Sequence, residues 1–133
     1  MGWPRPHSGF SAGQSTAKEE NCEMIQACLR IAAPADKLDE VLDVLRCLKG
    51  PTEVSKGCRV CRVLQDAEDK RVFTYLVQWD TQDDVEEHFR SERFRRLLPY
   101  IEMSVEPPEV DVSAIERIGG IEFLVDVLGG MAS

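Results

Sequence analysis

Hydrophobic and polar positions along the chain change their period several times, and each change predicts a new element. Residues 24–31 alternate between apolar and mixed positions, which is typical of a strand. After Pro34, apolar residues recur every three or four positions and predict one helix that ends at Gly50-Pro51. The stripe of this helix consists of Leu38, Val41, Leu42, Leu45 and Leu48.

The middle of the chain predicts two strands in a hairpin. Residues 57–65 and 71–79 are rich in strand-forming residues, and the polar stretch 66–70 between them is short enough for a turn. The two strands should therefore be antiparallel neighbours. Within the second strand, Tyr75 and Trp79 fall on one face together with other large apolar residues, while Val72 and Leu76 fall on the other.

Further helix starts are indicated at Thr81 and Ser91, and Pro99 should kink or end the second piece. Pro107-Pro108 interrupts the chain before a strand over residues 109–115. The apolar segment 121–128 fits either a strand or a helix.

The predicted order is β-α-β-β-α-β, which is typical of a ferredoxin-like α+β fold with an antiparallel sheet and helices on one face. We expect this domain to span residues 22–116, after a disordered tail over residues 1–21 and before a C-terminal extension over residues 117–133. Because the strand 71–79 is apolar on both faces, the face without helices needs a cover. A second subunit would supply it in a homodimer, and the C-terminal extension could reach that interface. The alternative is a monomer shielded by its own C-terminal segment.

Composition restricts the partners. The 133 residues carry a net charge of −8, which disfavours nucleic acid and anionic lipid as partners. No apolar run is long enough to cross a membrane, and the start of the chain has no secretory h-region. Five cysteines in a chain without an export signal are expected to be reduced thiols, which indicates a cytoplasmic location.

His88 is the candidate for acid–base chemistry. It is the only histidine beyond the N-terminal tail, and it borders the apolar face of its predicted helix next to Phe89. A neutral imidazole at such a position could take a proton or donate a hydrogen bond. The alternative is a histidine that caps the helix end or bonds a backbone carbonyl. Tyr75 and Trp79 could form an aromatic wall for a flat ligand, or they could be ordinary packing residues.

Two other groups of residues have a functional and a structural interpretation. Cys58 and Cys61 form a Cys-x-x-Cys motif, but in a regular strand their side chains would point to opposite faces, which argues against a redox or zinc site. Four arginines between positions 90 and 96 could attract an anionic ligand. A solvated helix face paired with neighbouring glutamates is the favoured interpretation of these arginines.

The chain resembles the antibiotic biosynthesis monooxygenase domain family. The resemblance rests on a sequence of features over about residues 24–115: Gly57-Cys58, Gln65-Asp66 and the hairpin, Val77-Gln78-Trp79-Asp80, His88-Phe89 and Phe94. The family implies a dimeric α+β barrel whose sheets pack face to face, with a pocket between sheet and helices in each subunit. It includes quinol monooxygenases that need no cofactor.

Carried over to this chain, the resemblance implies His88 as the catalytic residue, without a cofactor or a metal. It implies a small aromatic or quinol-type molecule as ligand, held by Trp79, Phe94, Phe89 and Tyr75. The sequence departs from the family at two positions, since Cys61 often corresponds to a Tyr and Val77 to a Glu. The loss of these polar groups favours the alternative of a dimeric binding or structural module without catalysis.

Overall fold

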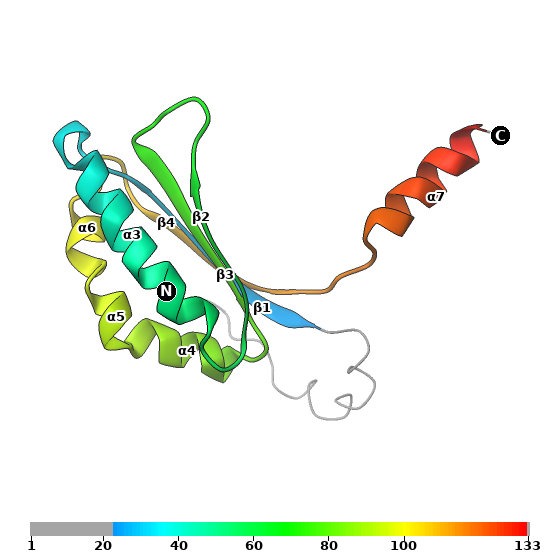
Figure 1. Cartoon of the computed structure of the whole chain (residues 1–133), viewed down its shortest axis with the longest axis horizontal. Helices are drawn as coiled ribbons and strands as arrows, with labels where there is room; N and C mark the ends of the chain where they lie inside the picture. Colours follow the sequence, from blue (N-terminus) through cyan, green and yellow to red (C-terminus); the bar gives the residue numbers. More distant parts are fainter. Residues whose placement is uncertain (1–22, 133) are drawn as a thin grey trace. The chain divides into compact units, whose positions relative to one another are not determined.

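The computed structural model describes residues 23–132, so the tail predicted over residues 1–21 lies outside the described part of the chain. The first elements are β1 (Met24–Ala32), a short 3-10 helix η1 (Ala35–Lys37), α3 (Leu38–Glu53), β2 (Cys58–Gln65) and β3 (Val72–Trp79). They are followed by α4 (Gln82–Arg90), α5 (Glu92–Arg95), α6 (Leu98–Glu102), β4 (Glu109–Ile115) and α7 (Ile121–Ala132) (Figure 1). The segment 121–128, whose sequence fits either a strand or a helix, is therefore helical.

The strands form one sheet in the order β2-β3-β1-β4, and β3 runs antiparallel to both of its neighbours. The helices α3 to α6 cover one face of this sheet (Figure 1). This topology confirms the predicted ferredoxin-like α+β fold, and the sheet remains open within the chain. The hydrophobic core lies between the covered face and the helices.

The two faces of β3 differ as its alternation predicts. The four large side chains at alternate positions point into the core, and none is more than 2% exposed: Phe73, Tyr75, Val77 and Trp79. On the opposite face Thr74, Leu76 and Gln78 are half-buried. Gln78 donates a hydrogen bond of 2.7 Å to Gln26 on β1, which ties the centre of the open face together.

Helix α3 continues past the predicted stop at Gly50-Pro51 and ends at Glu53. Proline removes only one backbone donor here, and it lies in the last turn, where most carbonyl groups need other partners in any case. Ser55 supplies two of these partners, because its hydroxyl donates to the Pro51 carbonyl at 2.9 Å and its N–H to the Thr52 carbonyl at 3.0 Å. The extension places Thr52 in the core with a fully buried side chain.

Both predicted helix starts after β3 are confirmed by side-chain caps. The Thr81 hydroxyl accepts a hydrogen bond from the Asp84 N–H at 3.1 Å, and the Ser91 hydroxyl accepts one from the Phe94 N–H at 3.2 Å. Pro99 lies in the first turn of α6, where it fits without a lost hydrogen bond. The caps determine the residue at which each helix begins, and therefore which of its side chains face the sheet and enter the core.

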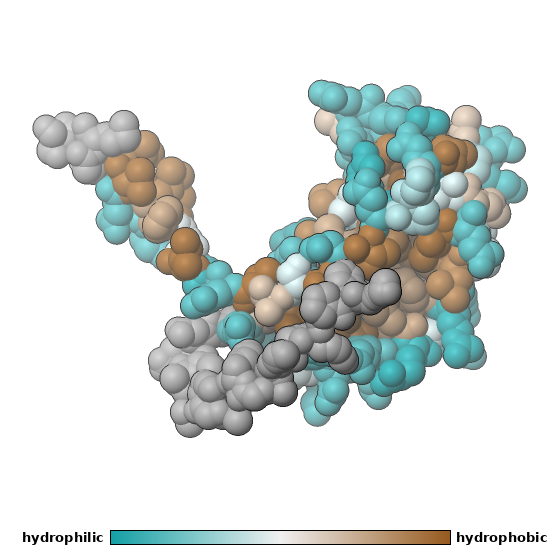
Figure 2. Space-filling model, turned by 180° about the vertical axis from the view of Figure 1, so that it is seen from behind, coloured by the Kyte–Doolittle hydropathy of each residue, from teal (hydrophilic) through white to brown (hydrophobic). Residues whose placement is uncertain are grey.

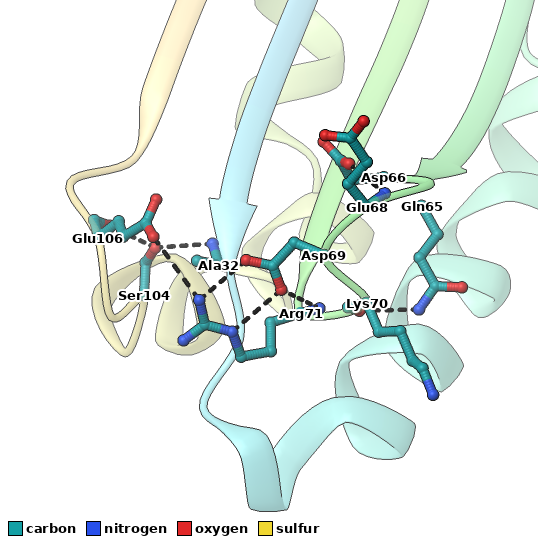
Figure 3. Close-up of polar contacts among 9 residues, drawn as sticks. All are labelled: Ala32, Gln65, Asp66, Glu68, Asp69, Lys70, Arg71, Ser104 and Glu106. Atoms are coloured by element: carbon teal, nitrogen blue, oxygen red, sulfur yellow. Dashed lines mark hydrogen bonds and ion pairs between the residues drawn. The ribbon is translucent and has the colours of Figure 1, made fainter.

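The β2–β3 hairpin is held by local polar contacts at its tip (Figure 3). The Asp66 carboxylate accepts the Glu68 N–H at 2.8 Å, which closes the turn after β2. Arg71 donates to the Asp69 carboxylate at 2.9 Å and lies 3.8 Å from Glu106, in the segment before β4. The turn predicted over residues 66–70 is thus confirmed, and it is also linked to the chain segment that enters β4.

A β-bulge at the start of β2 overturns one prediction. Cys58 lies opposite Trp79 and Cys61 opposite Val77, with a register shift just after Cys58, so β2 has one residue more than β3 over this stretch. Because Trp79 and Val77 share the covered face, both cysteines also face the helices, and both pack against the core. The expectation that they point to opposite faces was wrong, because it assumed a regular strand.

Gly57 precedes this bulge with φ +86°, a conformation that disfavours a side chain. A Cβ at this position would also collide with the Asp84 carboxylate. We expect Gly57→Ala to lower the free energy of unfolding by about 1–2 kcal/mol, the usual cost of this backbone region for an L-residue. Gly50→Ala is the matched control, because no atom of the described part of the chain lies within 4 Å of the Cβ position, and in a helix this change should stabilise the protein by about 0.5–1 kcal/mol. Urea unfolding of both variants measures the contrast, and equal effects would contradict it.

The chain divides into two compact units, and Met24–Ala114 form the one that contains the sheet and the helices α3 to α6. Helix α7 belongs to the other unit and is strongly apolar, with side chains that are about half exposed or more from Ile121 to Leu128. Figure 2 shows the brown, apolar surface of this helix and of the middle of the sheet unit. No helix among residues 23–132 is long and apolar enough to span a membrane.

Candidate functional site

Five ring-bearing residues from three elements meet on the covered face of the sheet. Tyr75 and Trp79 come from β3, His88 and Phe89 from α4, and Phe94 from α5. The imidazole of His88 is central, with ring centroids 5.0 Å from Trp79, 5.4 Å from Phe94 and 5.7 Å from Phe89. All five residues that the sequence suggested for a site are therefore brought together.

Local sequence explains why these rings converge. On α4, Val85, His88 and Phe89 are three and four residues apart, so they share the helix face that meets the sheet. The Ser91 cap then starts a new helix in another direction and directs Phe94 back onto Phe89, at a centroid distance of 4.9 Å. His88 is only 2% exposed, so it is a core residue rather than a boundary residue.

A buried polar cluster surrounds the hydroxyl of Tyr75. The hydroxyl lies 3.0 Å from His88 Nε2 and 3.5 Å from Thr52 Oγ1. The Cys61 thiol donates to the same oxygen at 3.8 Å. Burial is the main cause that raises the pKa of Tyr75, so the phenol keeps its proton at neutral pH.

Burial also lowers the pKa of His88 from 6.5 to about 4, with the positive charge of Arg93 as a second cause. The imidazole is therefore neutral at pH 7 and carries one proton. The shorter of the two contacts of the Tyr75 hydroxyl is to His88, and 3.5 Å exceeds the normal length of a hydrogen bond between two hydroxyl groups. We therefore assign the phenol as donor to Nε2, which leaves the imidazole proton on Nδ1.

Two buried N–H groups in this site have no hydrogen-bond partner within residues 23–132. Neither Trp79 Nε1 nor His88 Nδ1 has a hydrogen-bond partner among the described residues, and both residues are only 2% exposed. With the tautomer assigned above, both groups are donors. An unpaired buried donor costs about 1–3 kcal/mol, so each would be stabilised by an acceptor atom.

Arg93 has a different environment from the other arginines of its segment. Its guanidinium donates to Thr52 Oγ1 at 3.3 Å and to Ser55 Oγ at 2.7 Å, and thereby joins α5 to the end of α3. Arg90 matches the expected solvated face, since it lies 3.9 Å from Glu86 on the same helix. Arg93 instead places a positive charge beside the buried polar cluster.

An apolar pocket of about 200 Å³ opens next to the rings. Its lining comes from β1, β3, β4 and the helices α4 to α6: Ala27, Cys28, Leu29, Tyr75, Val77, Phe89, Phe94, Ile101 and Val110. Three of the five predicted site residues belong to this lining. Trp79 and His88 do not, although the His88 ring packs against the lining residues Phe89 and Phe94. Tyr75 belongs to both environments, because its ring lines the pocket and its hydroxyl contacts His88.

Sequence reasoning missed Thr52 as a site residue, and it interpreted Arg93 only as one of four arginines on a solvated helix face. Thr52 continues the stripe of Leu45 and Leu48 by four residues, and this spacing would have identified it. The proline at position 51 concealed the signal, because it predicted a helix end. Nothing in the spacing of Arg93 distinguishes it from its neighbours, since its role depends on the end of α3.

The arrangement can bind a small flat molecule and can donate hydrogen bonds to an oxygen atom. Within residues 23–132, no three His, Cys, Asp or Glu side chains gather in a way that could hold a metal ion. The neutral imidazole with a pKa of about 4 is a weak base, so donation of a hydrogen bond is the chemistry that the geometry favours.

Comparison with solved structures finds the same fold in several proteins. A conserved protein from Methanosarcina mazei Go1 is 22% identical with a TM-score of 0.64, over 69% of this chain and 92% of its own. A protein from Mycobacterium tuberculosis is 17% identical with a TM-score of 0.66, over 73% of this chain and 99% of its own. A third structure, described as an antibiotic biosynthesis monooxygenase, is 19% identical with a TM-score of 0.61, over 71% of this chain and 99% of its own. At these identities the likeness shows the fold alone.

A search of curated proteins finds no match to this sequence. The model of the family described as antibiotic biosynthesis monooxygenase matches residues 24–99, which is more than half of the chain. The match includes β1 to α5, and thus every residue of the aromatic and polar clusters described above. The chain belongs to the antibiotic biosynthesis monooxygenase family.

Proposed function

We propose that this protein is a monooxygenase that acts on a small aromatic or quinol-type molecule without a cofactor. The observation that carries the proposal is the pair of buried N–H donors without a partner among the described residues, Trp79 Nε1 and His88 Nδ1. They belong to the aromatic cluster whose other rings also line an apolar pocket. Apolar walls suit the ring of such a substrate, and buried donors suit its oxygen.

The size of the pocket limits the substrate. A cavity of 150 Å³ lined by apolar side chains is known to hold benzene, so about 200 Å³ is enough for one aromatic ring with small substituents. Phe89 and Phe94 line the pocket, and both also pack against the imidazole of His88, at centroid distances of 5.7 Å and 5.4 Å. Phe89 is only partly buried, and its rotation would give the substrate oxygen access to the donors.

The proposed chemistry uses hydrogen bonds rather than a strong base. Reaction with dioxygen requires an electron-rich anion of the substrate, and donors aimed at its oxygen favour this charged form. His88 would act as a donor through Nδ1, held in the required tautomer by the Tyr75 hydroxyl. The proton that the substrate loses would pass to solvent, because the pKa of His88 is only about 4.

The test is oxygen uptake with a panel of one-ring and two-ring hydroquinones. We expect uptake with one-ring compounds only, and a fall of about 10²-fold in His88→Ala, the usual loss for one donor at a developing oxyanion. Thr74→Val is the matched control, because Thr74 lies on the same strand as Tyr75 but on the open face. Absence of uptake with every compound, in a folded protein, would contradict the proposal.

A non-catalytic binding module is the second candidate, and the apolar lining of the pocket favours it. No charged side chain among residues 23–132 lines the pocket, and Cys61 and Val77 stand where the family often has a Tyr and a Glu. Isothermal titration separates the two candidates. Binding of a one-ring hydroquinone without oxygen uptake would support the module.

We also propose that the open face of the sheet pairs with a second copy of the chain. Leu76 and Cys28 lie side by side at the centre of this face, next to the Gln26–Gln78 hydrogen bond. The C-terminal extension, residues 117–133, would add its apolar helix to the same assembly. Light scattering at micromolar concentration should give a dimer mass for the wild type and a smaller mass for Leu76→Glu, whose buried charge would oppose pairing. A monomeric wild type would contradict this proposal.

A further inference from the structure

The Cys-x-x-Cys motif of β2 is the feature that the proposed function does not use. The β-bulge after Cys58 turns this side chain to the same face as Cys61. Cys61 is 2% exposed and Cys58 is half-buried, and both pack against the core cluster. The two thiols are close enough for the charge of one to raise the pKa of the other.

We propose that Cys58 and Cys61 form a reversible disulfide across the bulge. Cys58 and Cys61 lie opposite Trp79 and Val77, whose Cα atoms are two residues and about 6.8 Å apart on β3, and this span sets the expected scale of the separation between the two cysteines. This is the upper end of the usual range for disulfides, about 4.4–6.8 Å. The bond would therefore form with some strain, and a strained disulfide is readily reduced again.

The oxidant that fits is a small disulfide of the glutathione type. A hollow of about 300 Å³ lies over the motif and gives access to Cys58, the less buried thiol; it is lined by Glu53, Cys58, Arg59, Val60, Cys61 and Arg62. The Cys58 thiolate attacks one sulfur of the reagent, whose S–S bond breaks and releases one thiol. The Cys61 thiolate then attacks the mixed disulfide and releases the second thiol. The two protein thiols lose two electrons and two protons, and the reagent gains both.

Protonation sets the rate of this exchange. Burial raises the pKa of Cys58 to about 11, with Cys61 as the second cause, and burial also raises the pKa of Cys61. Because only the thiolate attacks, closure is slow at neutral pH, and its rate should rise about tenfold for each unit by which the pH increases toward 11. The pair thus responds to sustained oxidation rather than to brief exposure.

Closure of the disulfide would change the environment of Tyr75. In the reduced protein the Cys61 thiol donates to the Tyr75 hydroxyl at 3.8 Å, and the disulfide has no hydrogen to donate. The Tyr75 hydroxyl also contacts His88 Nε2, so the redox state of the pair reaches the candidate site through one side chain. This consequence rests on the proposed function, whereas the disulfide itself does not.

The experiment treats the full, reduced chain with excess oxidised glutathione at about pH 8.5, blocks the remaining thiols and digests with trypsin. Cleavage after Lys56, Arg59 and Arg62 places the two cysteines in separate tripeptides, 57–59 and 60–62, which stay joined only by a disulfide. We expect the joined tripeptides in the mass spectrum, and their separation by dithiothreitol. Cys47, which is exposed, should carry only glutathione.

The matched control is the double variant Cys58→Ser with Leu64→Cys. It keeps the Cys-x-x-Cys spacing, but Cys61 and position 64 lie in the regular part of β2 and face opposite sides. Leu64 is 47% exposed, so the change should be tolerated, and circular dichroism verifies the fold. We expect no joined peptides from this variant. Glutathione that remains on Cys58 of the wild type, or equal linkage in both proteins, would overturn the proposal. Neither outcome depends on whether the protein consumes oxygen.

Discussion

Trp79→Ala should lower the free energy of unfolding by about 3–5 kcal/mol, the usual cost of removing a large buried aromatic side chain. Trp79 is 2% exposed and is the largest of the fully buried side chains in the described part of the chain. The free energy of unfolding of a small domain is only about 5–15 kcal/mol, so the variant should be largely unfolded at moderate urea concentration. Urea unfolding followed by far-UV circular dichroism measures the loss.

Trp79→Phe separates packing from hydrogen bonding at the same position. It keeps an aromatic ring and removes the Nε1–H, which has no partner among the described residues. The smaller ring loses packing, but the protein no longer bears the cost of about 1–3 kcal/mol for an unpaired buried donor. Its stability should remain within about 1 kcal/mol of the wild type, whereas oxygen uptake should fall about 10²-fold.

Phe73→Leu is the control for the two Trp79 variants, because Phe73 shares the strand and the face of Trp79 and has no polar atom. It should lose stability and keep the uptake per folded molecule. Full uptake in Trp79→Phe would show that Nε1 does not contact the substrate.

The stability of the protein should fall steeply as the pH is lowered from 6.5 to about 4. In the unfolded chain His88 takes a proton near pH 6.5, whereas burial and Arg93 lower its pKa to about 4 in the fold. Between these two values the unfolded state binds a proton that the native state lacks, so the equilibrium shifts toward unfolding. The loss should reach about 3 kcal/mol, at about 1.4 kcal/mol for each pH unit between the two pKa values.

The variant His88→Gln isolates this contribution from that of the carboxylates. It retains a polar group next to the Tyr75 hydroxyl but has no proton to gain in this range. Urea unfolding at about pH 7.5 and pH 4.5 should give a smaller difference for the variant than for the wild type, by about 3 kcal/mol. Equal differences in the two proteins would mean that His88 titrates near its ordinary value in the fold.

Much of the site could be predicted from sequence because its residues follow local rules. The alternation of β3 places Tyr75 and Trp79 on one face of the sheet. The spacing on α4 places His88 and Phe89 on one face of that helix. Convergence of these faces follows from the order of the elements, since the helix after β3 must return over the sheet. The family resemblance points to the same residues.

The protonation states and the partners of these residues could not be predicted. They depend on Thr52, which packs beside the Tyr75 hydroxyl only because α3 continues past Pro51. They also depend on Arg93, whose charge acts on His88 because the cap at Ser91 turns α5 toward the end of α3. These contacts are between residues that are far apart in the sequence, so the local spacing of residues does not predict them.

The sequence by itself determined the order of the elements, the turn of the hairpin, the caps at Thr81 and Ser91, and which face of β3 enters the core. These features arise from neighbours within a few residues, where backbone geometry leaves few alternatives. Only the tertiary structure decided that Cys58 and Cys61 share a face, because a bulge depends on the register with β3. It also decided that His88 is buried and neutral, because desolvation depends on every element packed around the ring.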